Sequence, residues 1–352
     1  MDTVQISRLG RYRPLLVDEH DRLWASRGYT LYKSSDHGER FDVVGRLDAG
    51  FAHQLAGRLT LSSRLLRAGF HGLRILDNGT LLGVVKGGIV RLAPGETQFT
   101  VVHRFRHGSR PLTLCTTPGG AAFYGEYWGN DQREAVRIVG SFDAGDTWQA
   151  VYEFPAGSIR HVHGVHYDPY RDCCWVLTGD SDAESAVFVG GADWANLDRV
   201  VGGNQLCRAV TLIPTKDGVV LPTDTEHQQN YIQWLDPRTG TLEKIRPVAG
   251  TVFYSTKTVS KMLLSTVVEP GAGIQGDRVN ILASSNGWDW EQIHTQRKDR
   301  LSPILFQYGT FLLAPSSSKS DLAFAGGQAV RRDDQRLLRI EFDDNATHHS
   351  ES

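Results

Sequence analysis

One short motif constrains the fold of this chain more than any other feature. Residues 141–148 read SFDAGDTW, which sets a serine, an aspartate, a glycine and a tryptophan at fixed spacing. The Asp143 side chain can accept hydrogen bonds from backbone N–H groups inside a tight turn, and Gly145 can adopt a backbone angle that other residues resist. The motif therefore predicts a turn between two antiparallel strands, with Trp148 entering apolar space beside the following strand.

Two related segments lie on either side of this motif. Residues 34–41 (SSDHGERF) keep the serine, aspartate and glycine, and residues 284–290 (SSNGWDW) are a contracted version with asparagine for aspartate. Asp36 and Asp143 lie 107 positions apart, and Asp143 and Asn286 lie 143 apart. A step of about 50 residues divides these gaps into two and three units, which is the period of a four-stranded propeller blade.

The rest of the chain agrees with an all-β fold. Its 352 residues hold about seven such units, although six would also fit the spacing. Short β-branched runs such as residues 80–85 (TLLGVV) and 187–190 (VFVG) alternate with turns rich in Gly, Asp and Asn. We therefore predict a six- or seven-bladed β-propeller of four-stranded antiparallel blades, with seven the better fit.

The propeller is expected to form a single domain over residues 1–344. No linker divides this range, and residues 345–352 form a polar tail that we expect to be disordered. Because closure of the ring removes exposed sheet edges, the first and last strands should pair within one shared blade.

Charge and composition exclude several classes of partner. The net charge of −2 and the scattered basic residues argue against nucleic acid, and no apolar run is long enough to cross a membrane. The sequence shows no secretion signal, and its four cysteines, two of them adjacent, form a poor disulfide framework. We expect free thiols and a cytoplasmic location, and the oligomeric state is left open.

Histidines are densest in residues 158–169 (SIRHVHGVHYDP). His161 and His163 are two positions apart, so both should point to the same face of a strand. Such a pair can hold a metal, exchange a proton with a substrate or orient an anion, and the alternative is two channel-facing histidines satisfied by water and backbone. His166 lies outside this alternation and is expected to be structural.

A second cluster, residues 123–130 (FYGEYWGN), places Glu126 between aromatic residues. A carboxylate near apolar walls has a raised pKa and can act as a general acid, while Tyr127 and Trp128 could stack on sugar rings. The alternative is an ordinary amphipathic strand with Glu126 in solvent.

Other polar residues interrupt strand-like sequence at similar positions in the predicted blades. Arg208 lies in the otherwise apolar residues 207–213 (CRAVTLI), where an unpaired guanidinium is costly. A protein carboxylate or an anionic substrate should therefore meet it. The remaining candidates for substrate binding or catalysis are Arg67, His71, Asp180, Asp224, Tyr254, Glu269 and Lys298.

The three turns together resemble the Asp-box turns of the sialidase-like, or BNR-repeat, superfamily of β-propellers. This resemblance implies a glycan-active protein whose turns are structural rather than catalytic. It also implies that Arg67, Arg160 and Arg208 could form a carboxylate-binding triad and that Tyr254 and Glu269 could form a nucleophile pair. The Arg-Ile-Pro sequence that carries the first arginine of true sialidases is missing here.

Two reaction classes on an acidic oligosaccharide fit these residues. A glycoside hydrolase needs paired carboxylates, and Glu126, Asp180, Asp224 and Glu269 are available. A lyase acting on a uronic acid would use His161 or His163 as the base, Tyr254 as the acid and Arg208 to neutralise the carboxylate. We favour the hydrolase by a small margin.

A binding propeller without chemistry is the third alternative, since the fold alone implies no activity. No cofactor is required by any motif in the sequence. A divalent metal held by His71, His161 and His163 is a further alternative, although no metal-binding spacing such as H-E-x-x-H supports it.

Overall fold

The turn at residues 141–148 has the hydrogen bonds that its sequence predicts. In the computed structural model, which describes residues 3–50 and 60–343, Gly145 N–H donates to Ser141 Oγ at 2.9 Å and Thr147 N–H donates to Asp143 Oδ1 at 2.9 Å. Gly145 has a φ of 85°, and Trp148 donates its indole N–H to the carbonyl of Gly145 at 3.1 Å. The local chemistry of the turn thus fixes a tight hairpin.

The two related segments make the same serine-to-glycine hydrogen bond. Gly38 N–H donates to Ser34 Oγ at 2.8 Å, and Gly287 N–H donates to Ser284 Oγ at 2.9 Å. The three turns connect β4 to β5 (Thr30–Ser34, Asp42–Leu47), β12 to β13 (Val136–Ser141, Gln149–Phe154) and β24 to β25 (Arg278–Ser284, Glu291–Arg297). Each joins the third and fourth strands of a blade, in blades 1, 3 and 6, so the predicted spacing of two and three units is confirmed.

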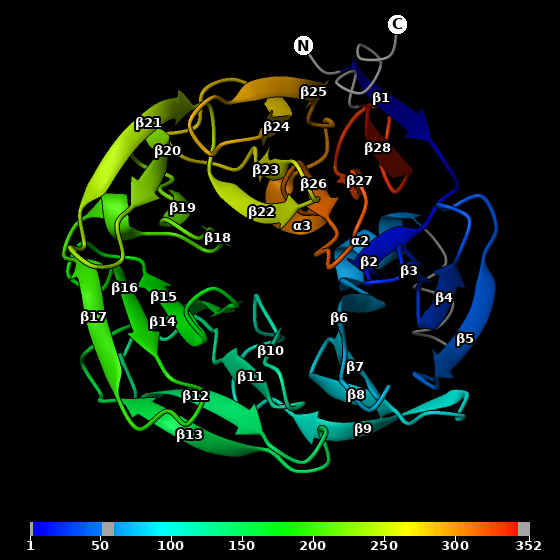
Figure 1. Cartoon of the computed structure of the whole chain (residues 1–352), viewed down its shortest axis with the longest axis horizontal. Coiled ribbons are helices and arrows are strands. Elements are labelled where there is room, and N and C mark those ends of the chain that lie inside the picture. Colours follow the sequence, from blue (N-terminus) through cyan, green and yellow to red (C-terminus); the bar gives the residue numbers. More distant parts are fainter. Residues whose placement is uncertain (1–2, 51–59, 344–352) are drawn as a thin grey trace, which may run out of the picture.

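Over the described residues, seven four-stranded antiparallel blades form a ring (Figure 1), and residues of their inner strands line a central cavity, which we call the channel. Blade 1 also contains β2 (Arg13–Val17) and β3 (Leu23–Arg27). Blade 2 consists of β6 (Phe70–Ile75), β7 (Leu81–Val85), β8 (Gly88–Leu92) and β9 (Gln98–Arg104). Blade 3 also contains β10 (Cys115–Thr116) and β11 (Ala122–Gly125). Blade 4 consists of β14 (His161–Asp168), β15 (Cys173–Gly179), β16 (Ala186–Gly190) and β17 (Leu197–Gly202). Blade 5 consists of β18 (Ile213–Pro214), β19 (Val219–Pro222), β20 (Asn230–Leu235) and β21 (Leu242–Val248). Blade 6 begins with β22 (Val252–Lys257) and β23 (Met262–Thr266), and blade 7 consists of β26 (Thr310–Leu313), β27 (Leu322–Gln328), β28 (Leu337–Asp343) and β1 (Thr3–Arg8).

Both ends of the described chain contribute to blade 7. Strand β1 pairs antiparallel with β28, from Thr3 opposite Asp343 to Arg8 opposite Leu338, and supplies the outer strand of the blade. This pairing closes the ring as expected from the sequence. A short parallel pairing between β5 and β9 also links the outer strands of blades 1 and 2. The tail at 345–352 lies outside the described residues.

Seven hydrophobic clusters hold the blades together, one in each interface between neighbouring blades. The closing aromatic residues of the turns belong to these clusters, with Trp290 7% exposed between blades 5 and 6. Burial of apolar surface at every interface stabilises the ring as a whole. All four cysteines are free thiols, as the sequence predicts.

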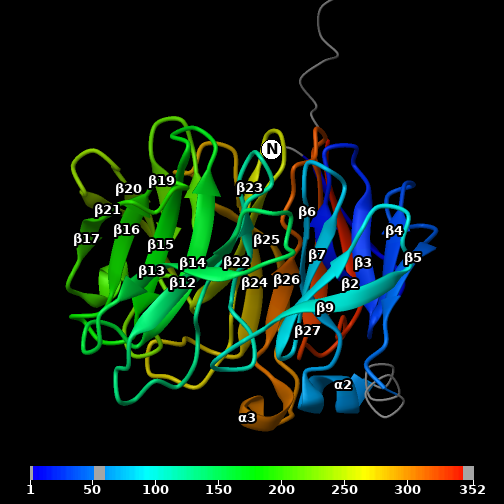
Figure 2. The same ribbon diagram turned by 90° about the horizontal axis from the view of Figure 1, so that it is seen from below.

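One face of the ring carries the loops that lead into the inner strands. Two short helices, α2 (Thr60–Leu66) before β6 and α3 (Pro303–Phe306) before β26, project from this face (Figure 2). A single turn of 3-10 helix, η1 (Gln205–Cys207), precedes β18. None of the described helices is both long and apolar enough to span a bilayer.

Candidate functional site

Two histidines and an aspartate converge in blade 4, at the face whose loops lead into the inner strands. We call this end of the channel its mouth. His161 and His163 lie on the inner strand β14, and a bulge shifts the pairing with β15 between Val162 and Gly164. His161 pairs with Gly179, the last residue of β15, so that Asp180 follows directly beside it. Both imidazoles point to the same side, as the sequence predicts, with 3.1 Å between their Nε2 atoms.

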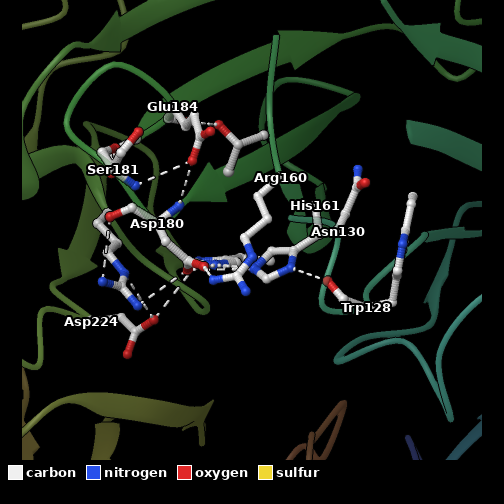
Figure 3. Close-up of polar contacts among 12 residues, drawn as sticks. Trp128, Asn130, Arg160, His161, Asp180, Ser181, Glu184 and Asp224 are labelled. Carbon is white, nitrogen blue, oxygen red and sulfur yellow. Dashed lines mark hydrogen bonds and ion pairs between the residues drawn. The ribbon is translucent and has the colours of Figure 1, made fainter. Parts of the chain in front are cut away.

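The carboxylate of Asp180 completes this cluster. Its Oδ1 atom lies 3.1 Å from Nε2 of His163 and 3.4 Å from Nε2 of His161. The second carboxylate oxygen, Oδ2, accepts a hydrogen bond from Arg160 at 2.9 Å (Figure 3). Burial favours the neutral acid, but hydrogen bonds and charges of His161 and His163 outweigh it when these imidazoles carry a proton on Nε2, so the pKa of Asp180 then lies well below its usual range.

Backbone carbonyls hold the outer nitrogen of each imidazole. Nδ1 of His161 lies 2.7 Å from the carbonyl of Trp128, and Nδ1 of His163 lies 3.2 Å from the carbonyl of Ala209. Both histidines are buried, and burial lowers the pKa of His163 although Asp180 opposes the shift. A carbonyl can only accept, so each Nδ1 carries the proton in this arrangement.

Arg208 connects the cluster to further carboxyl groups on blade 5. Its guanidinium lies 3.2 Å from Asp180, 2.7 Å from Glu226 and 3.7 Å from Asp224. Burial lowers the pKa of Arg208, but these three carboxyl groups outweigh it and raise the pKa above its usual value. Carboxyl groups of the protein itself are therefore the anionic partners that the sequence predicts for Arg208.

Two acids at this side of the mouth, the buried Asp224 and the half-buried Glu269, have raised pKa values. Burial raises the pKa of Asp224 well above its usual range, and Arg208 only partly opposes this while Glu269 and Glu226 add to it. Burial likewise raises the pKa of Glu269 to about 7, although the Thr251 hydroxyl donates a hydrogen bond to its carboxylate. We call Asp180, Asp224, Glu226 and Glu269 the acidic side of the mouth.

The opposite side, on blades 1 to 3, carries three arginines from separate segments. Arg13 begins β2, Arg67 lies before β6, and Arg110 lies before β10. Across residues 3–50 and 60–343, no carboxylate forms an ion pair with any of them, and Nε of Arg110 is buried without a partner. We call these three arginines the cationic side.

The arginines of the cationic side perturb one another. Burial lowers the pKa of Arg13 to about 10, with Tyr254 opposing the shift and Arg110 adding to it. Burial also lowers the pKa of Arg110, which Tyr254 opposes and Arg67 reinforces. The pKa of His71 lies well below its usual range because of burial and the charges of Arg110 and Arg13, so this imidazole is neutral at physiological pH.

Two tyrosines lie between the charged sides. Burial raises the pKa of Tyr127 to about 12, and this residue feels both the acids Asp224 and Asp180 and the cation of Arg110. Burial also raises the pKa of Tyr308, which feels Glu269 and, from the cationic side, Arg67. The ring of Tyr127 packs on His161 with 4.2 Å between centroids, so a neutral aromatic surface separates opposite charges.

Several residues singled out from the sequence lie outside this arrangement. Glu126 is buried, and its Oε2 accepts a hydrogen bond from the backbone N–H of Arg137 within blade 3. Nζ of Lys298 is held by Asp299 and by the carbonyl of Leu301. The ring of Trp128 stacks on His107 at 4.5 Å, so its contribution to the cluster is its carbonyl (Figure 3).

The combinations inferred from the family resemblance and from histidine content need correction. Arg160 and Arg208 form ion pairs with Asp180, whereas Arg67 lies on the cationic side, so these three do not form a triad. His71 is likewise on the cationic side, and Asp180 takes its place beside the histidine pair. For the predicted nucleophile pair, the main interactions also differ. Tyr254 opposes the lowering of the pKa values of Arg13 and Arg110 by burial, whereas the carboxylate of Glu269 accepts a hydrogen bond from the Thr251 hydroxyl.

Arg13, Arg110 and Glu226 belong to the site but are not predicted from the sequence. Arg13 and Arg110 each precede a proline just before or within an inner strand, and Glu226 lies two residues after Asp224 in the same loop. For the two arginines, the signal available in the sequence is a charged residue at or before the start of an inner strand.

No protein-family model and no curated protein sequence matches this chain. Solved structures do match it over most of its length. YCF48 bound to a D1 peptide is 15% identical with a TM-score of 0.56, covering 97% of both chains. An oligogalacturonate lyase in complex with manganese is 11% identical with a TM-score of 0.55, covering 97% of this chain and 91% of that one.

A third structure, the GH74 enzyme of Niastella koreensis, is 12% identical with a TM-score of 0.54. The match covers 93% of this chain and 60% of that enzyme. Identities this low establish a shared fold and nothing about activity. The chain is therefore a β-propeller, similar in its whole course to propeller proteins of different functions.

Proposed function

We propose that this protein is a carbohydrate-active enzyme, of glycoside hydrolase type, that acts on an acidic oligosaccharide at the channel mouth. One observation carries the proposal. A half-buried carboxyl group with a pKa of about 7, Glu269, lies at the same mouth as three arginines without carboxylate partners among the described residues. The first feature suits proton transfer to a leaving oxygen, and the second suits an anionic substrate.

Glu269 is the proposed general acid. An acid is most effective when its pKa lies near the working pH, since it is then still protonated yet able to give its proton up. Asp224 is the proposed second carboxyl group: its charge and that of Glu269 disfavour each other, so we propose that the pair shares one proton and that the ionised member serves as base or nucleophile. Paired carboxyl groups with different environments are what glycoside hydrolysis requires.

The cationic side is the proposed site for the carboxylate of a uronate- or sialate-type sugar. Guanidinium groups bind carboxylates through paired N–H donors, and the buried Nε of Arg110 has a donor to spare. Tyr127 and Tyr308 lie between this side and the acids, where an apolar face of a sugar ring could rest. The substrate would then span the mouth with its carboxylate on blades 1 to 3.

The comparisons give this proposal limited support. Two of the solved structures with this fold are of a GH74 enzyme and of an oligogalacturonate lyase. The hydrogen bonds of the three turns also favour placing the chain in the Asp-box, sialidase-like superfamily. Four free thiols favour a reducing compartment, so we propose that the substrate is met in the cytoplasm.

A lyase is the second candidate, and one specific observation favours it. The imidazoles of His161 and His163 present unprotonated Nε2 atoms at the mouth, which suits removal of a proton next to a uronate carboxylate. Tyr254, beside Arg13 and Arg110, would supply the acid near the neutralised carboxylate.

Incubation with a panel of acidic oligosaccharides tests the two reactions together. Hydrolysis produces reducing ends alone, whereas elimination also produces an unsaturated uronate that absorbs in the ultraviolet. We expect reducing ends without absorbance, lost in Glu269→Gln and retained in the matched control Glu126→Gln. Absorbance that disappears in His163→Ala would establish the lyase instead, and binding without either product would leave a glycan-binding propeller.

A further inference from the structure

We propose that His161, His163 and Asp180 bind a divalent first-row transition-metal ion, with zinc as the reference case. The three atoms that would coordinate it already converge. Nε2 of His161, Nε2 of His163 and Oδ1 of Asp180 lie 3.1 to 3.4 Å from one another. The site goes beyond the proposed function, because it is defined by its own ligands and can be measured without a substrate.

The protonation pattern of the two imidazoles demands a cation at this point. Each Nδ1 donates its proton to a backbone carbonyl, of Trp128 or of Ala209, so each Nε2 of a neutral imidazole carries a lone pair. With these tautomers no hydrogen lies between the two Nε2 atoms and Oδ1 of Asp180, although Arg208 also approaches Oδ1 at 3.2 Å from the side of blade 5. Either an additional proton or a metal ion has to lie between these atoms, and a metal ion satisfies all three at once.

The carbonyl contacts are also the support that metal-binding histidines usually have. A ligand histidine almost always donates its other ring N–H to a carbonyl or carboxylate, which fixes the tautomer and the ring orientation. Here the carbonyls of Trp128 and Ala209 supply that support from neighbouring blades 3 and 5, as Figure 3 shows for Trp128 and His161. The ligands are therefore oriented before any ion arrives.

Packing further restricts the position of the ligands. A side chain at Gly179 would place its Cβ 2.5 Å from Cε1 of His163, so this ring fills the space beside the backbone of β15. His161 and His163 are both buried, whereas the Asp180 side chain keeps 23% of its surface exposed. An ion can thus be reached from the channel mouth and retain open coordination positions there.

The local charge leaves room for a cation in spite of two nearby arginines. Arg160 and Arg208 contact Asp180, but Arg160 also pairs with Asp131, and Arg208 also contacts Glu226 and Asp224. Carboxyl groups therefore outnumber guanidinium groups around the cluster. Two imidazoles and one carboxylate favour zinc, iron, cobalt, nickel or manganese over calcium and magnesium, which prefer oxygen ligands alone.

Titration of the full-length protein with Co²⁺, after treatment with a chelator and dialysis, tests the site. Nitrogen coordination of Co²⁺ gives visible absorption bands, and we expect these to saturate at one equivalent and to disappear when Zn²⁺ is added. His163→Ala and Asp180→Asn should weaken binding by about 100-fold, since loss of supporting groups alone costs 10- to 100-fold. The matched control is His166→Ala on the same strand, whose Nε2 bonds to the carbonyl of Val210; it should bind like the wild type.

X-ray absorption at the zinc edge of the wild-type protein adds a measurement that requires no variant. Scattering from two imidazole rings supports the proposal, and a shell of oxygen atoms alone overturns it. Absence of saturable Co²⁺ or Zn²⁺ binding, or equal binding by the His161→Ala/His163→Ala double variant, also overturns it and assigns the cluster to a shared proton. These readouts do not depend on turnover, so they separate failure of the metal site from failure of the proposed reaction.

Discussion

The acidic side of the channel mouth surrounds its guanidinium with carboxylates, whereas the cationic side leaves three arginines without one. Arg208 contacts Asp180, Asp224 and Glu226, so its charge is compensated within the protein. Arg13, Arg67 and Arg110 lie near one another, and burial lowers the pKa of Arg13 and Arg110. A compensated buried charge supports the fold, while an uncompensated one is retained at a cost and is available to a ligand.

The largest expected effect is on stability and should appear on the acidic side. Arg208→Ala leaves the buried Asp224 and the half-buried Asp180 and Glu226 without their shared cation, which should lower the free energy of unfolding by about 3 kcal/mol. Arg110→Ala should change it by less than about 1 kcal/mol, because it removes a repelling charge. Urea unfolding of both variants measures the difference, and equal losses would contradict the distinction between the two sides.

The next effect concerns catalysis by the acidic side. Glu269→Gln should lower kcat on the preferred oligosaccharide about 100-fold, because the amide cannot donate the proton. In the wild type, activity should fall as pH rises above about 7, where Glu269 loses its proton, and the variant should lack this dependence. Steady-state rates between pH 5 and 9 test this, and an unchanged rate in the variant would exclude Glu269 as the acid.

Stability should also depend on pH through Glu269. Its pKa rises from 4.5 to about 7 on folding, so the folded state binds the proton more tightly than the unfolded state. The stabilising contribution is therefore present at low pH and is lost as pH rises through this interval. Wild type should lose on the order of 2 kcal/mol more than Glu269→Gln between pH 4.5 and 7.5.

Thermal midpoints over that interval, with Glu126→Gln as the control, measure this loss. The raised pKa of Asp224 acts in the same direction, so a smaller slope should persist in the Glu269 variant. Parallel pH profiles of the wild type and Glu269→Gln would show that the Glu269 carboxyl group titrates normally.

The smallest expected effect is on ligand binding by the cationic side. Arg110→Ala should weaken binding of a simple uronate such as glucuronate about tenfold, the loss of roughly one charge-assisted contact. Arg67→Ala should weaken it less, since Arg67 is exposed. Calorimetric titration measures both, with glucose as the neutral control. Unchanged affinity for glucuronate in Arg110→Ala would mean that the anion binds elsewhere.

Sequence separation explains why the site was harder to predict than the fold. His161 and His163 could be placed together because strand alternation relates residues two positions apart. Asp180 joins them because β14 and β15 form a hairpin, yet no pattern in the sequence favours it over His71 as the third ligand. Glu126 looked suitable by its aromatic neighbours, but its carboxylate meets a backbone N–H inside the blade.

The repeating architecture can be predicted from the amino-acid sequence alone. The three turns are stabilised by hydrogen bonds within eight residues, so their residues and spacing predict hairpins in blades 1, 3 and 6 and a ring of about seven blades. The tertiary structure alone decided the division of charge at the mouth. Arg13, Arg110, Arg208 and Glu269 come from strand ends and loops of different blades, and closure of the ring brings them around one channel. Burial and mutual charge, which set their pKa values, exist only after that closure.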